Sequence, residues 1–256
     1  MRTLADNVYA VGVQHWDRRL FDELIFMYLA GSRGVNTGFI FPTSYTGFAG
    51  NAFAAPDTEH LLHGGNATVK GDLDSADTMD VTLIERAKTR ATVMGGGTEE
   101  TPQIQPIMID GEEHFVAVMH PWQAYTMRTA AGAGNWLEIQ KSAATSEGRN
   151  SPIFKGGMGM HDSVVLHSHK NVIRFDDYGS GSNVTAARAL FLGSQAAVCA
   201  FGSPGTGLRF DWNEEMQDRG NQVVITTGSI FGVKKTRFNS KDFGVIALDT
   251  AAADPT

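Results

Sequence analysis

Residues 4–29 are LADNVYAVGVQHWDRRLFDELIFMYL, one long segment with helical periodicity. Its apolar side chains recur every three or four residues, which places them on one side of a helix. They are Leu4, Val8, Val11, Trp16, Leu20, Leu24 and Met27. Arg19 and Glu23 lie off this stripe and four residues apart, so they can pair on the helix surface. The sequence predicts a long helix that begins almost at Met1, with no capping sequence before it, and ends at Gly31.

Residues 32–73 are rich in Gly, Pro, Asn and Ser and predict irregular structure with one short strand. A long irregular segment inside a compact domain is typical of a functional or interfacial region. A second helix is predicted over residues 77–94, capped by Asp77 or Thr78 and stopped by the three glycines that start at residue 95.

Shorter elements are predicted from residue 104 onward. Strands at 104–109 and 114–119 are joined by a tight turn at Asp110 and Gly111. Pro121 suits the first position of a helix over 121–129. Further predictions are helices at 136–144 and 194–200, strands at 164–167 and 172–175, a flexible loop at 176–183 and an apolar run at 189–192.

The C-terminal part is predicted to be rich in strands, at 208–212, 223–227, 229–234 and 244–248. The tail from residue 249 to 256 is predicted to be frayed. Helices and strands alternate irregularly and many connections are long. This pattern favours an α+β fold over a doubly wound parallel sheet.

The composition excludes several classes of protein. The chain has 256 residues, 42% of them hydrophobic, which is enough for a substantial core in one large domain or two small ones. The net charge of −7 argues against a protein that coats nucleic acid. One cysteine excludes an intrachain disulfide, and the sequence contains neither a signal peptide nor an apolar run of ~18 residues.

Histidines provide the best metal-binding candidates. His167 and His169 would point to the same face of a strand, with His161 nearby. No cysteine or carboxylate follows at ligand spacing, so polar histidines on an edge strand are the favoured interpretation. A metal-dependent hydrolase that uses these three histidines stays as a minor alternative. His60 and His63 lie in the irregular segment and carry less signal.

The remaining candidate motifs favour structural roles. Cys199 has apolar neighbours, which predicts a small buried core residue rather than a nucleophile. The glycine-rich residues 156–160 predict a tight bend. The acidic pairs predict solvated or salt-bridged surfaces, and the basic cluster predicts a solvated or subunit-pairing face. These are Glu99 and Glu100, Glu112 and Glu113, Glu214 and Glu215, and Lys234, Lys235 and Arg237 around Thr236.

Five local sequences, in a fixed order, carry a resemblance to a known family. They are EHFVAVMHP (113–121), NSPIFKG (150–156), DRGN (218–221), FGVKKTRFN (231–239) and KDFGVI (241–246). With them the chain resembles the C-terminal two thirds of a tailed-bacteriophage major capsid protein with the HK97-type fold. The branch it resembles most closely is that of the coat proteins of N-four-like podoviruses.

The resemblance implies a division of the chain into domains. Residues 1–102 would form the peripheral domain, with the spine helix at 4–29 and the second helix at 77–94. Residues 103–220 would form the axial domain, with the loop at 176–183 near the capsomer axis. Residues 221–256 would return to the peripheral domain as strands along the spine helix.

The resemblance also implies a structural function without catalytic, cofactor-binding or metal residues. Copies of the chain would assemble into the hexamers and pentamers of an icosahedral head in the virion, after synthesis in the bacterial cytoplasm. Scaffold or decoration proteins are further possible partners, and packaged DNA would be contacted only indirectly. A cellular shell protein of the encapsulin type is the alternative, because it shares the fold.

One feature departs from the family pattern. In the family, an N-terminal arm and an extended two-stranded loop precede the spine helix, whereas here the helix begins almost at Met1. We therefore expect a fragment, a misassigned start or a truncated protein. Assembly of the chain on its own is correspondingly in question.

Overall fold

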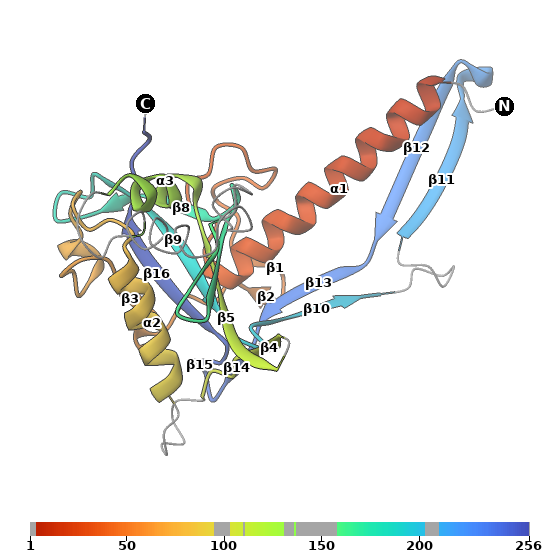
Figure 1. Cartoon of the computed structure of the whole chain (residues 1–256). Helices are drawn as coiled ribbons and strands as arrows, with labels where there is room; N and C mark the ends of the chain where they lie inside the picture. The colour runs from red at the N-terminus through yellow and green to blue at the C-terminus, as the bar shows by residue number, and fades with distance from the viewer. Residues whose placement is uncertain are drawn as a thin grey trace, which may run out of the picture.

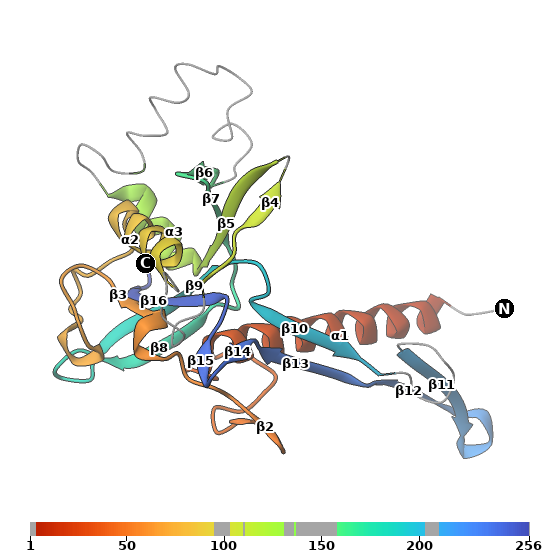
Figure 2. The same ribbon diagram turned by 90° about the horizontal axis from the view of Figure 1, so that it is seen from below.

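The computed structural model describes residues 4–94, 103–109, 111–130, 136, 158–202 and 210–255. In this part of the chain, a body built around one β-sheet carries a long projecting arm (Figures 1 and 2). The arm consists of α1 (Leu4–Ala30) and two strand pairs that run beside it. The helix predicted over residues 4–29 is thus confirmed, and it forms the main element of the arm.

The central sheet has eight strands in the order β3–β16–β9–β5–β7–β6, with β8 paired to β9 and β4 paired to β5. It is mixed, because β5 runs parallel to β7 but antiparallel to β9, and β16 runs parallel to β3 but antiparallel to β9. The α+β prediction is confirmed. The strands are Leu61–His63 (β3), Ile107–Ile109 (β4), Glu112–Met119 (β5), Met160–His161 (β6), Val164–Ser168 (β7), Ile173–Tyr178 (β8), Val184–Leu192 (β9) and Val245–Ala251 (β16).

The second helix, α2 (Val81–Val93), packs one apolar face into the main core of the body. Its buried residues include Leu83, Ile84 and Ala87, at helical spacing. The predicted cap was wrong: Asp80 caps the helix by accepting a hydrogen bond from Leu83 N at 2.8 Å. Asp77 is occupied elsewhere, because its carboxylate accepts from Asp74 N at 2.9 Å.

The third helix, α3 (Pro121–Thr129), has the predicted bounds and the predicted proline at its start. His120 caps it, because its Nδ1 accepts from Trp122 N at 3.2 Å. Gln123 completes the cap by accepting from His120 N at 2.8 Å. The Gln123 amide also donates to Ala187 O and Thr250 Oγ1, which fixes α3 to the sheet.

Near the body, α1 packs on the sheet through Leu24, Met27 and Tyr28, which are buried. Gly31 then ends the helix with a φ of +69°. A Cβ atom there would lie 2.1 Å from Ala54 O, so both the backbone angle and the space require glycine.

Two strand pairs accompany α1 along the arm. β10 (Ala197–Phe201) pairs with β13 (Phe231–Lys235), and β11 (Phe210–Gln217) pairs with β12 (Gln222–Ser229), in both cases antiparallel. The predicted helix at 194–200 was therefore wrong. Pairing along the whole of β13 overrides the weak local preference of this short segment. Two small hairpins complete the fold: Gly47–Phe48 (β1) with Asn51–Ala52 (β2), and Arg237–Phe238 (β14) with Lys241–Asp242 (β15).

The predicted frayed tail was also wrong at its start. Asp249, Thr250 and Ala251 belong to β16 and are buried, because β16 lies between β3 and β9. Likewise, β8 continues to Tyr178, three residues into the predicted loop.

Several predictions fall partly outside the described residues or concern the domain division. The glycine-rich segment is described only from Met158 onward, and of the helix predicted at 136–144 only Trp136 is described. The predicted boundary at 220/221 falls in the turn between β11 and β12. The division into peripheral and axial domains stays a prediction.

Candidate functional site

The arm is held together near the body by an aromatic cluster. The Phe21 ring of α1 lies 4.6 Å from the ring of Phe231 on β13 and 6.1 Å from that of Phe201 on β10. Phe201 and Phe231 also contact each other, at 5.0 Å. These contacts fix the β10–β13 pair to the helix.

Outside this cluster, the arm leaves large apolar side chains in solvent. Trp16 on α1 is 50% exposed, Met216 on β11 is 73% exposed and Ile230 beside β13 is 55% exposed. Val198 and Val223 are exposed as well. Exposed apolar groups gathered on one projecting element are typical of a protein interface.

The strand pairs of the arm also leave backbone groups unpaired. Each pair is a separate two-stranded sheet within the described residues, so each has two open edges. An isolated two-stranded ribbon has marginal stability in water, and open edges are templates for another chain. The arm is therefore the candidate functional site: a surface that a partner chain would cover.

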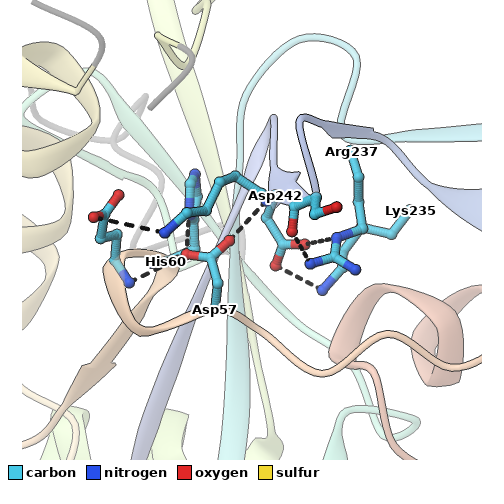
Figure 3. Close-up of polar contacts among 8 residues, drawn as sticks. Asp57, His60, Lys235, Arg237 and Asp242 are labelled. Atoms are coloured by element: carbon cyan, nitrogen blue, oxygen red, sulfur yellow. Dashed lines mark hydrogen bonds and ion pairs between the residues drawn. The ribbon is translucent and has the colours of Figure 1, made fainter. Parts of the chain in front are cut away.

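A polar network anchors the root of the arm to the body (Figure 3). Lys235, at the end of β13, donates to Asp242 Oδ2 at 2.7 Å, and Arg237 Nε lies 3.2 Å from Asp242 Oδ1. Asp242 N donates in turn to Asp57 Oδ2 at 2.7 Å. Asp57 Oδ1 lies 2.8 Å from His60 Nδ1. The network thus connects β13 and β15 to the irregular segment before β3.

The electrostatics of this network favour the charged carboxylate. Burial raises the pKa of Asp57, but the hydrogen bonds from Asp242 N and His60 outweigh it and lower the pKa below its usual value. Burial lowers the pKa of Lys235, and the nearby Asp242 carboxylate opposes that shift. The predicted solvated or subunit-pairing basic cluster was therefore wrong for Lys235, which is buried, while Lys234 is exposed.

A second buried network joins α1 to the sheet. The Arg188 guanidinium donates to both carboxylate oxygens of Asp249 at 2.7 Å and to Ala30 O, in the last turn of α1, at 2.9 Å. Tyr178 donates to Asp249 Oδ2 at 2.6 Å. Burial and the Asp249 charge raise the pKa of Tyr178 above its usual range. Burial lowers the pKa of Arg188, but Asp249 outweighs it and raises the pKa.

The histidine metal site is not formed in the described part of the chain, where no group of three potential ligands occurs. His161 Nε2 lies 3.0 Å from Glu85 Oε1. His169 stacks on Phe26, with the rings 4.7 Å apart, and His167 is exposed on β7. His60 belongs to the network of Figure 3, and burial lowers the pKa of His63.

The other candidates also have defined places. Cys199 lies exposed on β10, so its predicted burial was wrong: Ala196 and Ala197 pack against the core around the end of α1, but the strand is exposed from Val198 onward. Glu112 and Glu113 are exposed on β5, and Glu214 and Glu215 on β11, as expected for solvated or salt-bridged acidic pairs. Of the first acidic pair, Glu99 and Glu100, neither residue is described. No described helix is both long enough and apolar enough to cross a membrane.

Sequence reasoning placed Trp16 on the apolar stripe of the first helix but did not expect its exposure, and it did not identify the other exposed apolar residues of the arm or its anchoring networks. One signal was available for the arm: Met216 and Val223 flank the turn of a strand pair that has no helix predicted on either side. The networks gave no local signal, because Asp57 and Asp242 are 185 residues apart and Arg188 and Asp249 are 61 apart.

Known capsid proteins are similar to this chain in both sequence and structure. A family model described as phage capsid protein matches residues 7–254. The major capsid protein of Pseudomonas phage KPP25 is 27% identical over 257 residues, which covers 93% of this chain and 65% of the relative.

The solved structures agree. The capsid of Ralstonia phage GP4 has a TM-score of 0.82 at 55% identity, with 94% of this chain and 66% of that chain covered. The capsid asymmetric unit of cyanophage Pam1 has a TM-score of 0.71 at 20% identity, with 99% and 70% covered, and shows the fold alone. The expected HK97-type capsid fold is confirmed.

This chain spans slightly less than two thirds of the first two relatives, 65% and 66% of their lengths. The family match, in contrast, leaves only six residues at one end and two at the other outside it. The chain therefore belongs to the phage capsid protein family.

Proposed function

We propose that the protein is a major capsid protein, the structural subunit of an icosahedral phage head in the virion. The family match over residues 7–254 carries this proposal. The 55% identity to the capsid of Ralstonia phage GP4 supports it. The encapsulin alternative loses support, because the capsid of Ralstonia phage GP4, at 55% identity, and the major capsid protein of Pseudomonas phage KPP25 are both phage proteins.

The proposed mechanism is self-association through the arm. Among the described side chains of the arm, the large exposed apolar ones are Trp16, Val198, Phe201, Met216, Val223 and Ile230. Each is about half exposed, so covering all six contributes on the order of 6 kcal/mol per copy. Bringing a partner into place costs about 4–15 kcal/mol. One arm contact alone is thus insufficient, which favours closed rings in which several contacts act together.

The finer assignments belong to the same proposal. The peripheral domain would hold residues 1–102 and 221–256, and the axial domain residues 103–220, with the loop at 176–183 near the capsomer axis. The partners would be other copies in hexamers and pentamers, with scaffold or decoration proteins as further partners and packaged DNA in indirect contact. The role would be structural, without catalysis or cofactor.

Light scattering of the full chain over a range of concentrations tests the proposal. We expect species of five or six copies, or larger, that grow with concentration. The variant M216S/V223S should need at least tenfold higher concentration to associate, whereas the exposed control Thr226→Ser should match the parent. A monomer at every concentration, together with absence of the chain from purified phage heads, would refute the proposal.

A further inference from the structure

A cationic cleft lies at the edge of the body where β5 and β7 end. The two strands run parallel, with Met119 beside Ser168, so the segments that follow them meet at one edge. The cleft has a volume of about 490 Å³. Its lining includes His120 and Trp122 after β5, Lys170 after β7, and Arg174 on β8.

The cleft carries positive charge that the described residues do not neutralise. Its charged lining is Arg19, Lys170 and Arg174, and no carboxylate lines it in the part of the chain described. Arg19 is committed to the buried Glu23, at 3.0 Å. Neither Lys170 nor Arg174 has a carboxylate partner within the described residues; the Arg174 guanidinium lies 4.4 Å from the centre of the Trp122 ring.

The polar groups around these cations also suit an anion. His120 Nδ1 accepts a hydrogen bond from Trp122 N, so its Nε2 carries the ring hydrogen and is a donor. Burial and the neighbouring Arg174 lower the pKa of His120 to about 4, so the ring is neutral near pH 7. The first turn of α3 adds its positive dipole end at this edge.

The opposite end of the same strand carries acidic and apolar side chains. β5 begins at Glu112 and Glu113, which are exposed at the tip of the β4–β5 hairpin. Across the hairpin they face Ile109 and Met108, which are 42% and 61% exposed. Figure 2 shows this hairpin projecting from the body.

One copy cannot join its own tip to its own cleft. The eight residues of β5 separate them by roughly 26 Å at ~3.3 Å per residue. The complementary surfaces must therefore meet between copies, one tip with the next cleft. A contact between two different surfaces of identical chains is heterologous, and it closes into a ring when the rotation allows.

We propose that the acidic tip of the β4–β5 hairpin of one copy docks in the cationic cleft of a neighbouring copy. This inference rests on the proposed function and names one of its contacts. Copies of charge −7 repel one another, so a locally attractive pair sets which faces approach. Nucleic acid is the less suitable occupant, because two available cations in a chain of pI 5.6 provide few phosphate contacts.

Charge reversal on each side, with rescue, tests this contact in the full chain. E112K/E113K and K170E/R174E should each raise the concentration for half-association at least tenfold, measured by sedimentation velocity. Combining all four substitutions should restore association to within about threefold of the parent. The control T82K/T89K introduces two lysines at exposed positions of α2 and should behave like the parent.

Disulfide capture gives a readout that does not depend on assembly strength. In the Cys199→Ser background, chains with Glu113→Cys and chains with Lys170→Cys are mixed and oxidised. We expect a covalent dimer in the mixture and none with either chain alone.

The outcomes separate the contact from the proposed function. If the reversals leave association at the parent's level, or if the mixed cysteine variants form no disulfide, the contact is overturned and the proposed function stands. A parent that never associates and is absent from heads overturns both. Binding of a short single-stranded oligonucleotide that K170E/R174E abolishes and E112K/E113K leaves unchanged would assign the cleft to nucleic acid and overturn the contact.

Discussion

Asp249→Ala should destabilise the body of the protein more than any surface charge change. The substitution leaves the Arg188 guanidinium buried and without a counter-ion. Two hydrogen bonds of 2.7 Å to the Asp249 oxygens are lost, and those to Ala30 O and Tyr178 Oη remain. Removing one partner of a buried ion pair costs about 3–5 kcal/mol. Tyr178 also loses its acceptor, which adds about 1 kcal/mol.

The free energy of unfolding should therefore fall by about 4–6 kcal/mol, measured by urea denaturation with a far-UV signal. The matched control is the ion pair of Lys70 and Asp177, which is half exposed on both sides, with 2.6 Å between its charged atoms. Asp177→Ala should cost less than about 1 kcal/mol, because water solvates both groups.

A second variant separates the charge effect from simple loss of packing. R188M/D249L removes both charges, and apolar replacement of a buried pair is often near neutral. It still leaves Ala30 O and Tyr178 Oη with fewer partners, at about 1–3 kcal/mol. The double variant should therefore be more stable than Asp249→Ala alone. A cost below about 1 kcal/mol for Asp249→Ala, or a double variant less stable than the single one, would refute this reasoning.

Three further predictions concern single positions. The pKa of His120 is lowered to about 4 in the folded protein, whereas it is about 6.5 in the unfolded chain. Between these two pH values the unfolded chain binds the proton more readily, so the free energy of unfolding is about 3 kcal/mol lower at pH 4 than at neutral pH. In His120→Asn a helix cap that does not titrate replaces the histidine, so the midpoint of urea denaturation should change less between pH 6.5 and pH 4 than in the parent. Gly31→Ala should lower the melting temperature, because φ is +69° and the new Cβ meets Ala54 O, whereas Gly71→Ala, in open space, should change it little. Lys235→Met should lower the free energy of unfolding by about 2–4 kcal/mol in urea denaturation, because the buried Asp242 carboxylate then keeps Arg237 as its one cationic partner. A variant as stable as the parent would contradict this prediction.

Periodic segments with a strong local signal were predictable from the sequence. The helix over residues 4–29 and the helix that starts at Pro121 appear with nearly the predicted bounds, because apolar spacing and a proline at the first position act locally. The pair of Arg19 and Glu23 was also predictable, because four residues of helix bring the two side chains together.

Elements defined by distant partners were not predictable in the same way. Residues 197–201 have no helix or strand preference strong enough to decide, and pairing with β13 makes them a strand. Asp249 was expected in a frayed tail, but Arg188 and the neighbouring strands bury it. The same applies to Lys235, whose burial depends on Asp242 across a hairpin.

The position of the arm follows from these distant pairs. Arg188 fixes the end of α1 to β9 and β16, and the network of Figure 3 fixes β13 to the segment at Asp57. The end of α1 and the end of β13 are therefore both attached to the body by buried charged groups as well as by apolar contacts. The hydrogen bonds of these groups are directional. A surface that must meet a neighbour at a set angle benefits from this rigidity.

The buried cations also affect how copies recognise one another. Arg33, Arg188 and Lys235 are buried and bound to carbonyl or carboxylate oxygens, so three of the 21 basic side chains are not available at the surface. Among the described residues four carboxylates are buried as well, those of Glu23, Asp77, Asp242 and Asp249, so the surface keeps an excess of negative charge. In such a surface, the two uncommitted cations beside Trp122 form a distinct attractive point for the acidic hairpin tip of another copy. Because two acidic surfaces repel each other, docking of an acidic tip at these cations favours one defined geometry over contacts between acidic faces.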